Sequence, residues 1–302
     1  MESEDKAPNS NAASSPEAPV DSNFRMRLAL LLLFSFPTAY VGVLLAVIFH
    51  EVLGHGLSAV LLGGEFVGFS IHWDGMGTAT TRTTGATETQ EVLYLGAGIL
   101  VTTFVAIALL TYPFRNEARL FLRLTLALLA ISFVMDGSPY LLWSSLSPEF
   151  AVGDPARILE IIDSPWLRWW FVAAGVVLTV AGTFWSMSLF FRTAETWLGC
   201  GQPLSRRRRR IALVVLLIAP AVLSESLFDW NQLVPGIELL PSYFSVGVLV
   251  SISLWLDWRP RSVLPVELPL SASYGPLAAA WTSALALVLV VVLWLSDGVT
   301  WY

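Results

Sequence analysis

Two of the three histidines of the chain, His50 and His55, lie five positions apart, and Glu51 directly follows the first of them. All three residues belong to the first long apolar stretch. An ionisable side chain inside a membrane costs free energy, so a group of them needs a common reason. A bound cation supplies one, because imidazole is a good zinc ligand and a nearby carboxylate can act as a base on water. The cluster is therefore a candidate metal site.

The spacing of this motif differs from the common one. Helical zinc peptidases carry His-Glu-x-x-His, which places both imidazoles on one helix face. Here the sequence is His-Glu-x-x-Gly-His, and on an ideal helix the two imidazoles would stand about 140° apart. A π-bulge absorbs one residue, and Gly54 would ease one. A second geometry uses Glu51 and His55 as the ligand pair, with His50 turned away.

The composition is that of a membrane protein. The chain has 302 residues, of which 55% are hydrophobic and 13% charged, and its mean hydropathy is +0.67. The single cysteine, Cys200, excludes an intrachain disulfide and a thiolate metal cluster. Residues 1–23 are rich in Ser, Pro, Ala and acids, which predicts a disordered cytoplasmic tail rather than a cleavable signal peptide.

The elements that must position the motif are membrane helices. We predict an all-α polytopic membrane protein with about seven transmembrane helices and a small β-hairpin after the first. The apolar stretches are Leu28–Leu62, Val92–Tyr112, Leu120–Trp143, Trp166–Phe191, Ile211–Phe228, Tyr243–Leu256 and Gly275–Leu295. The first is too long for one perpendicular span, so either the span begins near Pro37 or one helix runs the whole way.

The distribution of basic residues predicts the orientation of these spans. With a cytoplasmic N-terminus, the internal segments hold 14 of the 17 Lys and Arg residues, and the external segments hold Arg82, Arg157 and Arg168. The external loops are acidic instead. The N-terminus is thus expected on the cytoplasmic side of a membrane and the C-terminus on the external side. The five-arginine run, Arg206–Arg210, is then a headgroup contact, and no nucleic-acid partner is expected.

Residues 65–84 are different in kind. Gly63 and Gly64 end the first helix, Asp74-Gly75 is a hairpin-turn signal, and Thr78–Thr84 is rich in threonine. We therefore expect a β-hairpin close to the end of the motif helix. The small residues Gly96 to Gly98 predict a close approach of the second span.

Two aspartates are candidates to complete the metal site. Asp136 lies near the external end of the third span, and Asp154 precedes a short amphipathic helix ending near Ile162. Either aspartate has an ordinary alternative role: Asp136 as a turn residue at the headgroups, and Asp154 as a helix N-cap. His72, on the hairpin, is expected to be a plain external residue.

The order of these features resembles the site-2 protease family of intramembrane zinc metalloproteases, in its bacterial branch. The similarity lies in the motif helix, the hairpin, the Gly-Ala-Gly-Ile-Leu opening the next span, the segment Asp136-Gly137-Ser138-Pro139 and the segment Gly153–Leu159. Here Asp136 stands where the family has Asn, and Pro155 where it has Gly. The motif spacing alone also resembles that of the dipeptidyl peptidase III family, a soluble enzyme otherwise unlike this chain.

The resemblance implies a function and the role of each residue. His50, His55 and Asp154 would bind Zn²⁺, Glu51 would be the general base, and Asp136 would be a rival third ligand or a substrate contact. The implied activity is cleavage of peptide bonds in membrane-embedded or membrane-adjacent substrates, and the implied location is a bacterial cytoplasmic membrane. The protease-like membrane core would be residues 24–192, and residues 193–302 would form a three-helix membrane extension.

Other functions remain open at this point. The chain could be a catalytically inactive membrane scaffold or sensor that keeps the fold, in which the motif is a buried polar network. A permease is less favoured, because polar residues do not line several spans. If the chain is a protease, the hairpin could pair with an unwound substrate strand. The sequence gives no oligomeric state.

Overall fold

The computed structural model describes residues 22–72, 77–112, 120–146, 153–199, 204–212, 215–216 and 273–300. Within them, five helices are long and apolar enough to cross a membrane: Asn23–Leu61, Glu88–Thr111, Leu120–Leu146, Pro165–Leu198 and Tyr274–Leu295. The predicted helical membrane fold is confirmed by these five helices and a small sheet. Of the predicted spans, Tyr243–Leu256 and most of Ile211–Phe228 lie outside the described residues, as do residues 1–21 of the predicted tail.

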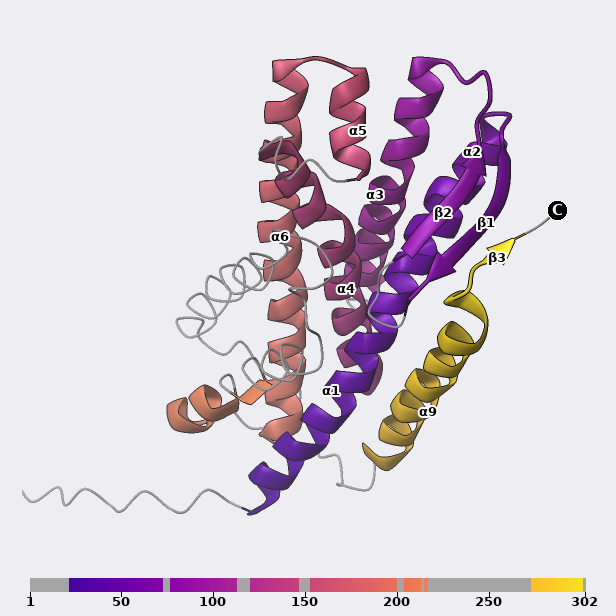
Figure 1. Cartoon of the computed structure of the whole chain (residues 1–302). Coiled ribbons are helices and arrows are strands. Elements are labelled where there is room, and N and C mark those ends of the chain that lie inside the picture. Colours follow the sequence, from indigo (N-terminus) through magenta and orange to yellow (C-terminus); the bar gives the residue numbers. More distant parts are fainter. Residues whose placement is uncertain are drawn as a thin grey trace, which may run out of the picture.

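The first span is one uninterrupted helical path. Helix α1 (Ser22–Ile48) passes through Pro37 without a break and continues as the π-helix η1 (Phe49–Gly56) and the short helix α2 (Leu57–Leu61). Of the two alternatives that the sequence leaves open, the structure has the continuous helix. The motif therefore lies far along this path, close to the hairpin, as Figure 1 shows.

Four further helices surround this path. Helix α3 (Glu88–Thr111) begins with a capping box, in which Thr87 and Gln90 bond each other's backbone amides. Helix α4 (Leu120–Leu146) packs against α1, α3 and α6 (Pro165–Leu198). Helix α9 (Tyr274–Val290), extended by the π-helical turn η7 (Val291–Leu295), lies along α1 (Figure 1).

The predicted hairpin is present, and a third strand joins it. Strand β1 (Glu65–Ile71) pairs antiparallel with β2 (Gly77–Arg82), with an irregularity between Phe66 and Gly68. Strand β3 (Val299–Thr300) pairs with Gly68 and Phe69 on the other side of β1, giving the order β2-β1-β3. No pattern in the sequence predicts the two-residue strand β3. The last span thus brings a strand from the far end of the chain back to the hairpin.

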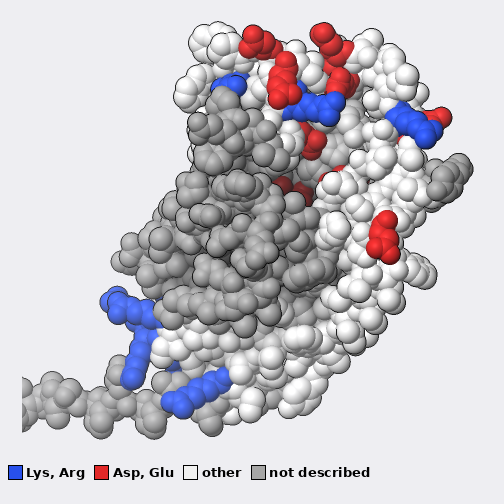
Figure 2. Space-filling model, in the orientation of Figure 1, with Lys and Arg blue, Asp and Glu red and all other residues white. Residues whose placement is uncertain are grey.

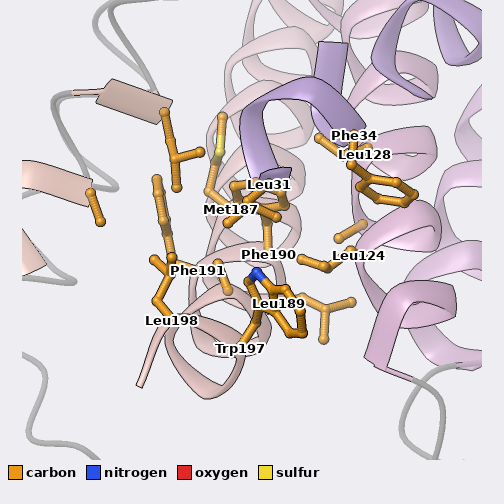
Figure 3. Close-up of a cluster of buried hydrophobic side chains, with 14 of the residues drawn as sticks. Leu31, Phe34, Leu124, Leu128, Met187, Leu189, Phe190, Phe191, Trp197 and Leu198 are labelled. Carbon is orange, nitrogen blue, oxygen red and sulfur yellow. The ribbon is translucent and has the colours of Figure 1, made fainter. Parts of the chain in front are cut away.

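The largest buried cluster lies at the end of the bundle where α1 begins. Figure 3 shows Leu31 and Phe34 of α1 facing Leu124 and Leu128 of α4, with Phe191 and Trp197 of α6 beside them. In a lipid surrounding, such side chains stabilise the bundle through van der Waals packing rather than by leaving water. This cluster packs the start of α1 against the end of α6, at the end of the bundle away from the His50–His55 motif.

Charged residues take part in this end of the bundle. The Arg27 guanidinium lies 4.4 Å from the centre of the Trp197 ring and donates to the Trp197 carbonyl. Arg209 of the five-arginine run is buried and donates to Glu195 at 2.6 Å. The prediction that the whole run contacts headgroups is therefore wrong for Arg209, because the Glu195 carboxylate gives it a buried ion pair. Figure 2 shows Lys and Arg side chains where α1 begins and acidic side chains at the opposite end.

Candidate active site

The motif residues lie on a π-helix. In η1 the backbone hydrogen bonds run from residue i to i+5, so residues five apart stand one above the other. The rings of His50 and His55 accordingly have their centres 5.0 Å apart, and both are buried. The predicted distortion is confirmed, and it covers the eight residues Phe49–Gly56 rather than a single turn at Gly54. It absorbs the extra residue of the motif.

Two glycines let α3 approach this π-helix. A Cβ added to Gly54 would meet the backbone of Gly98, with the Gly98 nitrogen at 2.8 Å. A Cβ added to Gly98 would overlap the imidazole of His50, with Cε1 at 2.9 Å. The small residues at 96–98 therefore do allow a close helix approach, as predicted. The sequence pattern gave no sign that Gly98 makes room for His50 in particular.

Asp154 brings the third side chain to the two histidines. It is the first residue of α5 (Asp154–Ile161), a short helix that packs against α3, α4 and α6. Its Oδ2 lies 3.3 Å from His50 Nε2 and 3.0 Å from His55 Nε2. One ligand atom from each of the three residues lies within 4.8 Å of the others. The π-helix η1 and the short helix α5 thus bring three side chains to one point.

Burial and hydrogen bonding act oppositely on this aspartate. Burial by itself would raise the pKa of Asp154, but the hydrogen bonds with His50 and His55 outweigh it and hold the pKa at about 2. The carboxyl group is therefore ionised at neutral pH. An ionised carboxylate only accepts hydrogen bonds and is a competent metal ligand.

The other ring nitrogen of each histidine has its own partner. Nδ1 of His55 lies 3.1 Å from the backbone carbonyl of Tyr94, which can only accept, so this nitrogen is the donor. Nδ1 of His50 lies 2.8 Å from Oδ2 of Asp136 and donates to that carboxylate. Outer partners of this kind fix the tautomer and the orientation of metal-binding histidines.

The hydrogen bonds at Nδ1 determine whether the Nε2 atoms of His50 and His55 carry a lone pair or a proton. When His50 and His55 are neutral, with their protons on Nδ1, both Nε2 atoms present lone pairs to the ionised Asp154 oxygen. These three atoms then repel one another unless a cation lies among them, and that cation can be a metal ion or a proton on each Nε2. For bonds of about 2.0–2.1 Å in tetrahedral geometry, ligand atoms stand about 3.3 Å apart, close to the two observed distances. The residues therefore fit a zinc ion.

The two remaining candidates lie beside this group. Glu51 is half-buried, and its Cγ lies 3.1 Å from where a Cβ on Gly77 would be, so its side chain reaches the start of β2. Asp136 is not in the three-residue group, because it contacts the opposite nitrogen of His50. The alternative with His50 turned away does not match this arrangement. His72 is exposed at the end of β1.

Sequence reasoning missed two residues at this site. The Tyr94 carbonyl carries no signal in the sequence, because any residue has a carbonyl. Tyr140 could have been noticed, since it lies four residues after Asp136 and so on the same face of α4. The N-cap of α5 is Gly153, so Asp154 does not have the N-cap role that was its ordinary alternative.

Of three comparisons with known proteins, one finds a match, and this match covers the first four described spans. A search among curated proteins and a search among solved structures give no match to the chain. A family model described as Peptidase M50B-like matches residues 24–197, from the start of α1 to the end of α6. Members of this family are in general zinc-dependent peptidases, which suggests a metallopeptidase of intramembrane type. Because the match covers more than half of the chain, the protein belongs to the Peptidase M50B-like family, within the site-2 protease group.

Proposed function

We propose that this protein is an intramembrane zinc metalloprotease that cleaves peptide bonds of membrane-embedded or membrane-adjacent substrates. One observation carries the proposal: two inner imidazole nitrogens and an ionised carboxylate converge within 4.8 Å, while both outer nitrogens are bound by acceptors. Without a metal, the same contacts would require a second proton on each imidazole, donated from Nε2 to Asp154. The family match supplies the reaction class.

Each residue of the site has its own role in the proposed reaction. His50, His55 and Asp154 would hold the zinc ion, which when bound supplies Lewis-acid polarisation to the scissile carbonyl and the attacking water. Glu51 takes a proton from that water as the C–O bond forms, and returns it to the amine leaving group when the C–N bond subsequently breaks. Asp136 keeps His50 in the tautomer with its proton on Nδ1.

Removal of the metal tests this proposal. We expect the detergent-purified protein to contain one zinc per chain by elemental analysis. Dialysis against a strong chelator should abolish cleavage of model single-span peptides in liposomes, and added Zn²⁺ should restore it, whereas added Mg²⁺ should not, because two of the three ligands are imidazoles. A wild-type protein that holds no zinc after purification and takes up none would contradict the proposal and favour an inactive scaffold or sensor.

The sheet beside the site suggests how a substrate is held. Strand β2 is an edge strand whose first residue, Gly77, lies against Glu51, whereas the far side of β1 is partly occupied by β3. A substrate strand added to β2 would gain main-chain hydrogen bonds and lie next to the general base. We therefore infer that an unwound membrane substrate pairs with β2.

Proline at Ala79 and at Thr80, in separate variants, tests this pairing. Successive residues of an antiparallel strand turn their N–H groups to opposite edges, so one of the two prolines removes an outward donor and spares the pairing with β1. That variant should cleave model peptides about 10-fold more slowly with its zinc retained, since removing one donor and leaving its acceptor unpaired costs about 1–3 kcal/mol. Ala79→Val and Thr80→Val keep the N–H and serve as controls. Wild-type cleavage by both proline variants would contradict the pairing.

A further inference from the structure

Tyr140 of α4 lies against the loop that delivers Asp154. A Cβ added to Gly153 would overlap the Tyr140 hydroxyl, so the backbone and the hydroxyl are in direct contact. The backbone amide of Asp154 donates a hydrogen bond to this hydroxyl. Tyr140 therefore contacts the backbone of Asp154, the residue whose side chain faces both His50 and His55.

The start of α5 explains why this contact is needed. The first amides of a helix lack partners within the helix and usually receive them from an N-cap side chain. The N-cap of α5 is Gly153, which has no side chain to offer and has a φ of 83°, where a Cβ would be strained. The Tyr140 hydroxyl accepts from the Asp154 amide in place of a cap. It thereby fixes the backbone of Asp154 relative to α4.

One face of α4 then supports two ligands of the site. Asp136 accepts from Nδ1 of His50, and Tyr140, one turn later, holds the backbone of Asp154. Pairs of this kind set the distance between the ligands that they orient. From this geometry we propose that Tyr140 is a positioning residue for Asp154, and that its hydroxyl sets the affinity and geometry of the metal site. The inference rests on the proposed zinc-binding function.

Tyr140→Phe removes the hydroxyl and keeps the ring. We expect zinc affinity, measured by competition with a chelator of known affinity on the full-length protein in detergent, to fall about 10- to 100-fold, as for other outer-shell groups. Tyr112→Phe makes the same change on an exposed side chain at the end of α3, away from the site, and should bind zinc as the wild type does.

A spectroscopic measurement separates positioning from a general loss of packing. The visible absorption of the Co²⁺-loaded protein reports ligand geometry, and it should differ between Tyr140→Phe and the wild type. Reduced affinity with an unchanged cobalt spectrum, or unchanged affinity, would overturn the inference. If the wild type itself bound neither metal, the proposed function would fail instead, so the two failures are distinguishable.

A second variant tests the same contact from the loop. Gly153→Ala places a Cβ where the Tyr140 hydroxyl lies, and it should also weaken zinc binding. Because both changes break one contact, their effects in the double variant should be less than additive. Fully additive losses would overturn the inference. This variant also provides the test if Tyr140→Phe cannot be purified as a folded protein.

Discussion

Replacing Glu51 by glutamine is expected to abolish peptide cleavage while leaving bound zinc in place. Glutamine has nearly the shape of glutamate but cannot take up a proton from water. General-base catalysis contributes about 10²–10⁴-fold, so the rate of cleavage of a model single-span peptide should fall by that factor. Glu51 is not among the three residues that converge on the metal site, so the zinc content should stay that of the wild type.

Glu88→Gln is the matched control for this change. Glu88 is exposed in the first turn of α3, and the same substitution there should leave both cleavage and zinc unchanged. Retained cleavage by Glu51→Gln would show that another group takes the proton. Loss of zinc in Glu51→Gln would instead support the alternative in which Glu51 is itself a ligand with His55.

His55→Ala is expected to lose the zinc ion and, with it, all cleavage. His55 Nε2 lies 3.0 Å from Asp154 Oδ2, and its other nitrogen is bound to the Tyr94 carbonyl, so no neighbouring side chain replaces it in the described site. Loss of a direct ligand should weaken binding more than the roughly 10–100-fold that outer-shell changes cost. Elemental analysis after purification should therefore find no zinc.

The third histidine of the chain provides the control. His72→Ala removes an imidazole of the same kind from the exposed end of β1 and should retain one zinc per chain. Full zinc occupancy in His55→Ala would contradict the assignment of the ligand set. Loss of zinc in His72→Ala as well would indicate that histidine number, rather than the geometry of η1 and α5, governs binding.

Much of the fold follows from local sequence. The apolar stretches predict the described spans because bilayer thickness sets the length of a helix. Strands β1 and β2 follow from the sequence because Gly63 and Gly64 end the helix and β-prone threonines come after them. Strand β3 could not be predicted in this way, since its two residues gain their pairing from Gly68 and Phe69, which lie more than two hundred positions earlier.

For the site, the sequence by itself determined which residues are costly in a membrane: His50, Glu51 and His55, with Asp136 and Asp154 as acids to complete them. The tertiary structure decided how they meet. Only the packing of η1 against α4 and α5 places Asp154 at the inner nitrogens and Asp136 at an outer one, because these hydrogen bonds join side chains from three separate elements. The extra residue of the motif is absorbed by η1, whose i→i+5 bonds align His50 and His55.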